Sequence, residues 1–172
     1  MVILVTGGAR SGKSRYAEVR LRELAPQPAW VYFATAMIAD EEMRLRIHQH
    51  RQRRDDGWRT IEAPHDLIGA LQREGPGASG VLVDCVTMWL SNRILEGATD
   101  DELISAAEDL ARAARDQVAP VILVTNEVGS GIVPEYELGR RFRDLAGRIN
   151  QRLAASADEV VLVACGLPLR LR

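Results

Sequence analysis

The chain has 172 residues, of which 22 are lysine or arginine and 24 are aspartate or glutamate, giving a formal net charge of −2. This near balance gives no overall case for binding nucleic acid or a membrane surface. The length favours a single domain over residues 1–172, large enough to bury about two-thirds of its unfolded surface. The chain starts without a secretory signal, and no apolar stretch approaches the roughly 20 residues of a bilayer span, so we expect a cytoplasmic protein. Cys85 and Cys165 lie in or beside apolar runs and are expected to be buried free thiols.

Short apolar runs recur along the chain and are typical of buried strands. They lie at residues 2–6, 30–35, 81–85, 121–125 and 159–164. Helical patterns separate most of them, and the longest cover residues 100–117 and 135–157, with Gly139 or Gly147 as a candidate break in the second. The alternation predicts an α/β fold with a mainly parallel sheet and helices on both faces.

A glycine-rich segment joins the first expected strand to a helical pattern. It matches the phosphate-binding sequence G-x-x-x-x-G-K-[ST], and Lys13 within it is the only lysine of the chain. A compact ammonium can reach between two phosphates, whereas a guanidinium prefers forked pairing. Backbone N–H groups of such a loop and the following helix N-terminus attract anions, and the Ser14 hydroxyl is suited to Mg²⁺. The predicted phosphate site comprises Gly7, Gly8, Ala9, Arg10, Ser11, Gly12, Lys13 and Ser14.

Polar residues end or follow three other expected strands. Asp84 ends an apolar run. In P-loop enzymes, the second sequence element that holds Mg²⁺ is likewise a hydrophobic strand that ends in an acidic residue. The alternative is that the aspartate only helps to form the turn after the strand. Ligands of parallel sheets collect at the carboxyl ends of the strands, so Asp84, Thr35 and Asn126 are expected to face the phosphate site. The loop at 126–134 is either a substrate-holding loop or a plain glycine-rich connection.

A charged helical pattern at residues 40–54 carries two of the three histidines, His48 and His50. Residues two apart on a helix point to different faces, which argues against a zinc pair. The arginines that follow His50 could neutralise a triphosphate beside a nucleophilic imidazole, and the alternative is a solvated helical face. These are Arg51, Arg53 and Arg54.

Four co-ordered segments resemble the bifunctional adenosylcobinamide kinase / adenosylcobinamide-phosphate guanylyltransferase family. They are residues 5–14, 46–51 with 58–62, 124–134 and 142–151. The resemblance implies a RecA-like P-loop fold, commonly homotrimeric, with two activities. The first is phosphorylation of the aminopropanol hydroxyl of adenosylcobinamide with ATP or GTP. The second is transfer of GMP from GTP onto that phosphate through a guanylylated histidine, which gives adenosylcobinamide-GDP.

The resemblance also implies a set of site residues. His50 matches the family's histidine position, and His48 is the competitor. Beyond residues 7–14, the nucleotide site carries over to Ala34, Thr35, Ala36, Arg51, Gln52, Arg53, Arg54, Glu62 and Asp84, with Ser14 and Asp84 toward Mg²⁺. The chain departs from the family at Gln49, where some relatives have histidine, and at residues 55–56, where a proline often sits.

Two other functions fit the residues without the resemblance. One is an ordinary small-molecule P-loop kinase that forms no covalent GMP adduct. The other is a nucleotide-gated binding module, in which the phosphate loop drives partner affinity rather than group transfer. Acceptor-stimulated turnover and a covalent GMP adduct distinguish these alternatives from the bifunctional enzyme.

Overall fold

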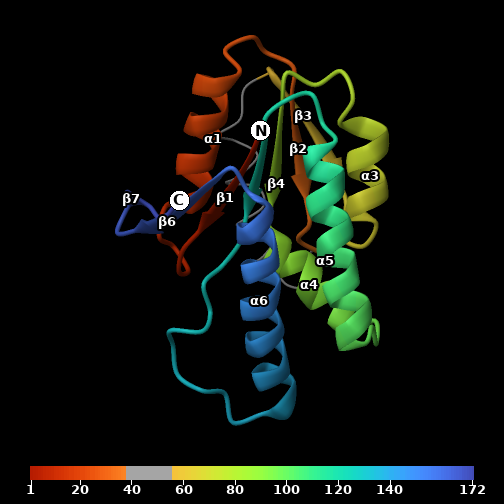
Figure 1. Cartoon of the computed structure of the whole chain (residues 1–172), viewed down its shortest axis with the longest axis vertical. Helices are drawn as coiled ribbons and strands as arrows, with labels where there is room; N and C mark the ends of the chain where they lie inside the picture. The colour runs from red at the N-terminus through yellow and green to blue at the C-terminus, as the bar shows by residue number, and fades with distance from the viewer. Residues whose placement is uncertain (38–55) are drawn as a thin grey trace.

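The computed structural model describes residues 1–37 and 56–172, which form one seven-stranded sheet in the order β3-β2-β4-β5-β1-β6-β7 (Figure 1). The strands are β1 (Val2–Thr6), β2 (Trp30–Ala34), β3 (Trp58–Glu62), β4 (Gly80–Asp84), β5 (Val121–Val124), β6 (Glu159–Ala164) and β7 (Leu167–Arg170). All neighbouring strands are parallel except β6 and β7, which are antiparallel. The predicted mainly parallel α/β fold is confirmed.

Helices cover both faces of this sheet, which explains why its central strands are apolar along their whole length. The described helices are α1 (Lys13–Leu24), α3 (Leu67–Glu74), α4 (Val86–Leu95), α5 (Asp100–Arg115) and α6 (Glu137–Ser156). Helix α1 packs on β1, β4, β5 and β6, whereas α3 packs on β2 and α5, and α6 packs on α5 and β1 (Figure 1). Among the described residues, no helix combines the length and apolarity needed to cross a bilayer.

Alternate residues of the central strands belong to two separate cores. Ile3 and Val5 of β1 pack with Leu21 of α1 in one core. Val2 and Leu4 of the same strand belong to the other, which contains the buried faces of α3, α4, α5 and α6. This two-residue alternation is the pleat of a strand covered on both sides.

The structure differs from the sequence-based expectation in three elements. Strands β3 and β7 were not predicted, because β3 is only partly buried and every residue of β7 is exposed, so neither has a continuous apolar run. Helix α6 is continuous through Gly139 and Gly147. Its residues Leu145, Ile149 and Leu153 are spaced four apart, so they form one buried stripe that stabilises the helix. The charged helical pattern at 40–54 lies outside the described residues.

The expectation for the two cysteines is half right. Cys85 is buried, but Cys165 is exposed at the turn between β6 and β7. The apolar run that suggested burial ends at Ala164, and the hairpin turn carries the next residue out of the sheet. Both cysteines are free thiols.

Candidate nucleotide site

The glycine-rich loop joins β1 to α1 at the carboxyl edge of the sheet, the lower edge in Figure 1. A Cβ added to Gly7 would lie 2.4 Å from the backbone oxygen of Val163, so β6 leaves room only for glycine there. Gly12 adopts φ +93° and is the N-cap residue of α1. Because glycine has no side chain, no side-chain cap accepts hydrogen bonds from the N–H groups of the first helical turn. A loop held this tightly against a helix N-terminus is the backbone geometry that binds phosphate.

The Lys13 side chain folds back over the glycine-rich loop that precedes it. The side chain is buried, and Nζ donates a hydrogen bond to the Gly8 carbonyl oxygen at 3.0 Å. The ammonium therefore lies over the loop rather than extending into solvent. A bound phosphate oxygen can replace the neutral carbonyl as acceptor, and a charged acceptor makes the stronger hydrogen bond.

Strand register places three predicted site residues at one level of the sheet. Ala34 pairs with Glu62 on one side and with Asp84 on the other, and Asp84 in turn pairs with Val124. Adjacent strands lie about 4.8 Å apart, so Asp84 is about 10 Å from β1, and Glu62 is about 19 Å from it. These residues therefore extend the carboxyl edge away from the glycine-rich loop.

Asp84 and Thr35 have different roles. Asp84 is half-buried, and its Oδ2 accepts a hydrogen bond from the Tyr32 hydroxyl at 3.0 Å. Thr35 is fully buried; its Oγ1 donates to the Cys85 carbonyl at 2.7 Å and accepts from the Cys85 N–H at 2.8 Å. The Thr35 hydroxyl therefore secures the connection from β4 to α4, and the expectation that Thr35 faces the phosphate site stays a prediction. Its half-buried neighbour Ala36 leads toward residue 37, where the described segment ends.

The Cys85 thiol beside Asp84 is unreactive. Burial, with a smaller contribution from the charge of Asp84, raises its pKa to about 12. A thiol with so high a pKa stays protonated near neutral pH and is neither a nucleophile nor a metal ligand.

A polar network, which the sequence did not reveal, fixes the loop after β5 against the glycine-rich loop. Thr87 Oγ1 lies 3.0 Å from Thr125 Oγ1 and accepts from the Asn126 N–H at 2.6 Å. Asn150 of α6 accepts from the Thr125 hydroxyl at 2.7 Å and donates to the Asn126 carbonyl. The Glu127 N–H then donates to the Gly7 carbonyl at 3.0 Å. The loop at 126–134 is thus anchored beside the phosphate loop at its start.

The turn between β6 and β7 supports the phosphate loop from the other side. The Gly166 N–H donates to the Ser11 carbonyl oxygen at 2.9 Å, and a Cβ on Gly12 would lie 3.3 Å from Gly166 Cα. Sequence reasoning missed this residue, although a glycine between two short apolar runs is a hairpin signal. Gly166 is therefore a neighbour of the phosphate loop despite its distance along the chain.

Substituting Gly166 by alanine should weaken nucleotide binding several-fold. Gly166 has φ +80° and open space around its Cβ position, so the change strains the backbone by about 1 kcal/mol without a clash. The strain falls on the turn whose Gly166 N–H donates a hydrogen bond to the Ser11 carbonyl oxygen. Gly77→Ala is the matched control, since Gly77 has φ +85°, similar open space and a place in the turn before β4. Titration with a fluorescent GTP analogue, alongside thermal unfolding, measures both. Equal losses of affinity in the two variants would contradict the assignment.

The sequence-predicted nucleophile and its arginines belong to the segment between β2 and β3. His48, His50 and the segment Arg51, Gln52, Arg53 and Arg54 lie outside the described residues. Their roles remain predictions from the sequence.

A mainly parallel sheet in which an interior first strand leads through a glycine-rich loop with lysine into a helix defines a RecA-like P-loop fold. A solved structure of an ATPase domain shares this fold, with a TM-score of 0.54 and 12% identity over 94% of this chain and 68% of that one.

Two curated relatives match from end to end. One is the bifunctional adenosylcobalamin biosynthesis protein CobU of Salmonella typhimurium strain LT2, 44% identical over 185 residues and 100% of both chains. The protein of the same name from Escherichia coli K12 is 42% identical over 184 residues, again covering 100% of both. The family model "Cobinamide kinase / cobinamide phosphate guanyltransferase" matches residues 3–171, and the chain belongs to that family. The predicted family and enzyme class are confirmed.

Proposed function

We propose that this chain phosphorylates the aminopropanol hydroxyl of adenosylcobinamide with ATP or GTP. It then transfers GMP from GTP to the new phosphate, giving adenosylcobinamide-GDP and pyrophosphate, as a step of adenosylcobalamin biosynthesis. The observation that carries the proposal is the family match over residues 3–171 in a chain that retains an intact phosphate loop. The match favours this enzyme over a kinase without GMP transfer and over a nucleotide-gated module. We further propose that it acts as a cytoplasmic homotrimer of single P-loop domains.

The kinase step requires positioning and charge neutralisation more than covalent chemistry by the protein. Lys13 would exchange its bond to the Gly8 carbonyl for bonds to the β- and γ-phosphate oxygens. Backbone N–H groups of residues 8–13 would bind the same phosphates at the start of α1. As the γ-phosphoryl group moves to the corrinoid hydroxyl, negative charge shifts to the bridging oxygen, where these donors stabilise it.

The oxygen donors at this edge fit Mg²⁺. Ser14 lies in the first turn of α1 and Asp84 ends β4, and a hydroxyl with a carboxylate is the hard-oxygen set that this cation prefers. Within residues 1–37 and 56–172, no group of three or more His, Cys, Asp or Glu side chains could hold a metal ion. Mg²⁺ sites that use few protein ligands complete their shell with substrate phosphates and water, and the ion neutralises phosphate charge during transfer.

Asp84→Asn should raise the Mg²⁺ concentration needed for half-maximal kinase activity by at least about tenfold, because the amide removes the ligand's charge. Asparagine is nearly isosteric and retains an oxygen that can accept from the Tyr32 hydroxyl, so the fold should persist. Asp116→Asn, at the exposed end of α5, is the control. A Mg²⁺ titration at saturating nucleotide measures the effect. An unchanged titration curve in Asp84→Asn would remove the aspartate from the metal site.

Guanylyl transfer takes place at the α-phosphorus and needs a separate nucleophile, for which we propose His50. A neutral imidazole nitrogen attacks the α-phosphorus, the bond to the β-phosphate oxygen breaks, and pyrophosphate leaves. The phosphoramidate keeps the transferred group reactive. A phosphate oxygen of adenosylcobinamide phosphate then attacks phosphorus and releases the imidazole. Arg51, Arg53 and Arg54 would neutralise the triphosphate. The rest of the proposed nucleotide site would be Ala34, Thr35, Ala36, Gln52, Glu62 and Asp84.

A double-label assay tests the proposed function. Adenosylcobinamide is incubated with GTP labelled either at the γ- or at the α-phosphate, and corrinoid products are separated. We expect γ-label in adenosylcobinamide phosphate and α-label in adenosylcobinamide-GDP. Incorporation of γ-label alone would indicate an ordinary kinase. Slow hydrolysis without stimulation by the corrinoid would indicate a nucleotide-gated module.

A further inference from the structure

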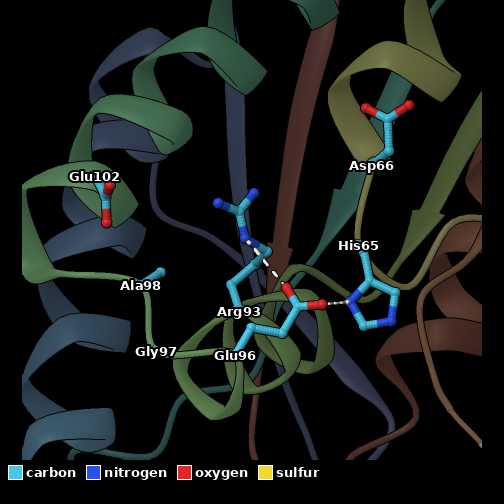
Figure 2. Close-up of a pocket in the computed structure, with 7 residues that line it drawn as sticks. All are labelled: His65, Asp66, Arg93, Glu96, Gly97, Ala98 and Glu102. Carbon is cyan, nitrogen blue, oxygen red and sulfur yellow. Dashed lines mark ion pairs between the residues drawn. The ribbon is translucent and has the colours of Figure 1, made fainter.

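A hollow lies beside the end of β3, away from the glycine-rich loop. It has a volume of about 470 Å³, which is within the size range of small-molecule sites. Its polar side chains come from three parts of the chain: His65 and Asp66 after β3, Arg93 and Glu96 near the end of α4, and Glu102 in the first turn of α5 (Figure 2). None of these residues belongs to the nucleotide site described above.

Hydrogen bonds fix the walls of this hollow to the carboxyl edge of the sheet. Asn92 of α4 donates to the carbonyls of Thr35 and Pro64, at 2.9 Å each. The Trp89 indole N–H, one turn earlier, donates to the His65 carbonyl at 3.0 Å. Helix α4 itself starts directly after Asp84 and Cys85. The hollow therefore opens from the same rigid edge that carries the nucleotide-site residues.

The three carboxylates of the hollow each have a partner in the protein. Asp66 accepts from Arg73 at 2.9 Å and caps α3. Glu96 lies 2.7 Å from His65 Nδ1 and 3.6 Å from Arg93 Nε. Two hydrogen bonds from Thr99 hold the pKa of Glu102 below its ordinary value, with Arg93 adding to the effect, so this carboxylate is charged near neutral pH.

The Arg93 guanidinium has unused donors. Its Nε faces Glu96, while its terminal nitrogens point into the space between Asp66 and Glu102 (Figure 2). In the part of the chain that the structure describes, these two nitrogens have no hydrogen-bond partner. The hollow thus presents a pair of N–H donors, and its lining also includes the carboxylates of Asp66, Glu96 and Glu102, which can still accept.

This donor and acceptor pattern suits a neutral primary amide. The amide carbonyl can accept from Arg93, and the amide NH₂ can donate to the neighbouring carboxylates. An anion would also reach Arg93, but it would enter a hollow whose lining carries three carboxylates. A cation without a hydrogen-bond acceptor would be repelled by the positive charge of the Arg93 guanidinium. A group that carries both a carbonyl oxygen and N–H donors satisfies the whole set.

We propose that this hollow binds the amide side chains on the edge of the corrin ring of the substrate, with Arg93 as a specificity-determining residue. The proposal rests on the proposed function, which makes cobinamide, a macrocycle with several primary amide arms, the acceptor. No other part of that substrate offers neutral groups that are both donors and acceptors in such number.

The spacing is compatible with one substrate that reaches both sites. The end of β3 lies four strand spacings, about 19 Å, from the end of β1 and its phosphate loop. The aminopropanol arm, about seven bonds from ring to hydroxyl, extends about 8 Å. The macrocycle is about 9 Å across and an amide arm on its far side adds about 4 Å, which together exceed the remaining distance of about 11 Å. A corrinoid with its hydroxyl near the γ-phosphate can therefore place its opposite edge in the hollow.

Arg93→Met tests the proposal, because methionine keeps the helix and the unbranched stem but removes every donor. We expect the KM for adenosylcobinamide to rise about tenfold, with the KM for ATP and GTP-dependent labelling of the protein without corrinoid unchanged. Arg112→Met, on the exposed side of α5 outside the hollow, is the matched control. An unchanged KM for the corrinoid, or an equal rise in the KM for ATP, would overturn the proposal.

Substrate analogues give a second readout that needs no variant. Cobinamide with one peripheral amide hydrolysed to a carboxylate should bind the wild-type enzyme more weakly than cobinamide. Glu96→Gln should reduce that discrimination by removing one negative charge. Equal or tighter binding of the carboxylate form to the wild-type enzyme would overturn the amide assignment. Failure of the proposed function is distinguishable, since the wild-type enzyme would then not phosphorylate cobinamide at all.

Discussion

Replacing Lys13 by alanine should lower kcat/KM of the kinase reaction on the order of a hundredfold or more, about 3 kcal/mol of transition-state stabilisation. Its ammonium is already buried against the loop, where Nζ donates to the Gly8 carbonyl, so little reorganisation is needed when phosphate enters. Steady-state phosphorylation of adenosylcobinamide by ATP measures the loss. The larger part should appear in kcat, because charge develops only during transfer.

Lys13→Arg separates charge from shape. The guanidinium keeps the positive charge, but it is bulkier and its fork cannot fill the space of an ammonium beside Gly8. We expect it to restore only a small part of the lost activity. Thermal unfolding of both variants checks that the loop still folds. Full activity in Lys13→Arg would show that net charge alone is sufficient, and near-normal kcat in Lys13→Ala would remove the lysine from catalysis.

Replacing His50 by alanine should abolish transfer of GMP while leaving much of the phosphorylation of adenosylcobinamide. The two reactions occur at different phosphorus atoms, and only attack at the α-phosphorus needs a protein nucleophile. GTP labelled at the α-phosphate should give the wild-type protein an acid-labile, base-stable adduct, as expected for a phosphoramidate. That adduct should be absent from His50→Ala.

His48→Ala is the matched control, because His48 lies two residues away in the same segment. It should retain the adduct. If the adduct persists in His50→Ala and is lost in His48→Ala, the nucleophile is His48. Loss of both phosphorylation and adduct in His50→Ala would instead indicate a general role in nucleotide binding.

The central part of the fold could be predicted because it has a local signature. Strands β1, β4 and β5 are covered on both faces, so each is a continuous apolar run that stands out from its neighbours. The phosphate loop is equally local, since its donors lie within eight consecutive residues between a strand and a helix. The family resemblance rested on segments of the same kind and is confirmed.

The edges of the sheet could not be predicted in this way. Strand β3 pairs with β2 on one side only, and β7 is exposed along its length, so solvent contact removes the apolar pattern. Thr35 follows a strand, and from the sequence it is predicted to face the phosphate site. Its orientation depends on Cys85, a residue on a different strand connection, and no local pattern encodes that contact.

By itself the sequence determined the fold class, the phosphate loop around Lys13 and the family, because each depends on residues that are adjacent or nearly so in the chain. Only the tertiary structure decided that Gly166 supports Ser11, that Tyr32 bonds Asp84 and that Arg93 faces a hollow with unused donors. Those relations join segments that are distant in sequence. They arise from how strands order themselves in the sheet, and that order is set by the packing of the whole chain.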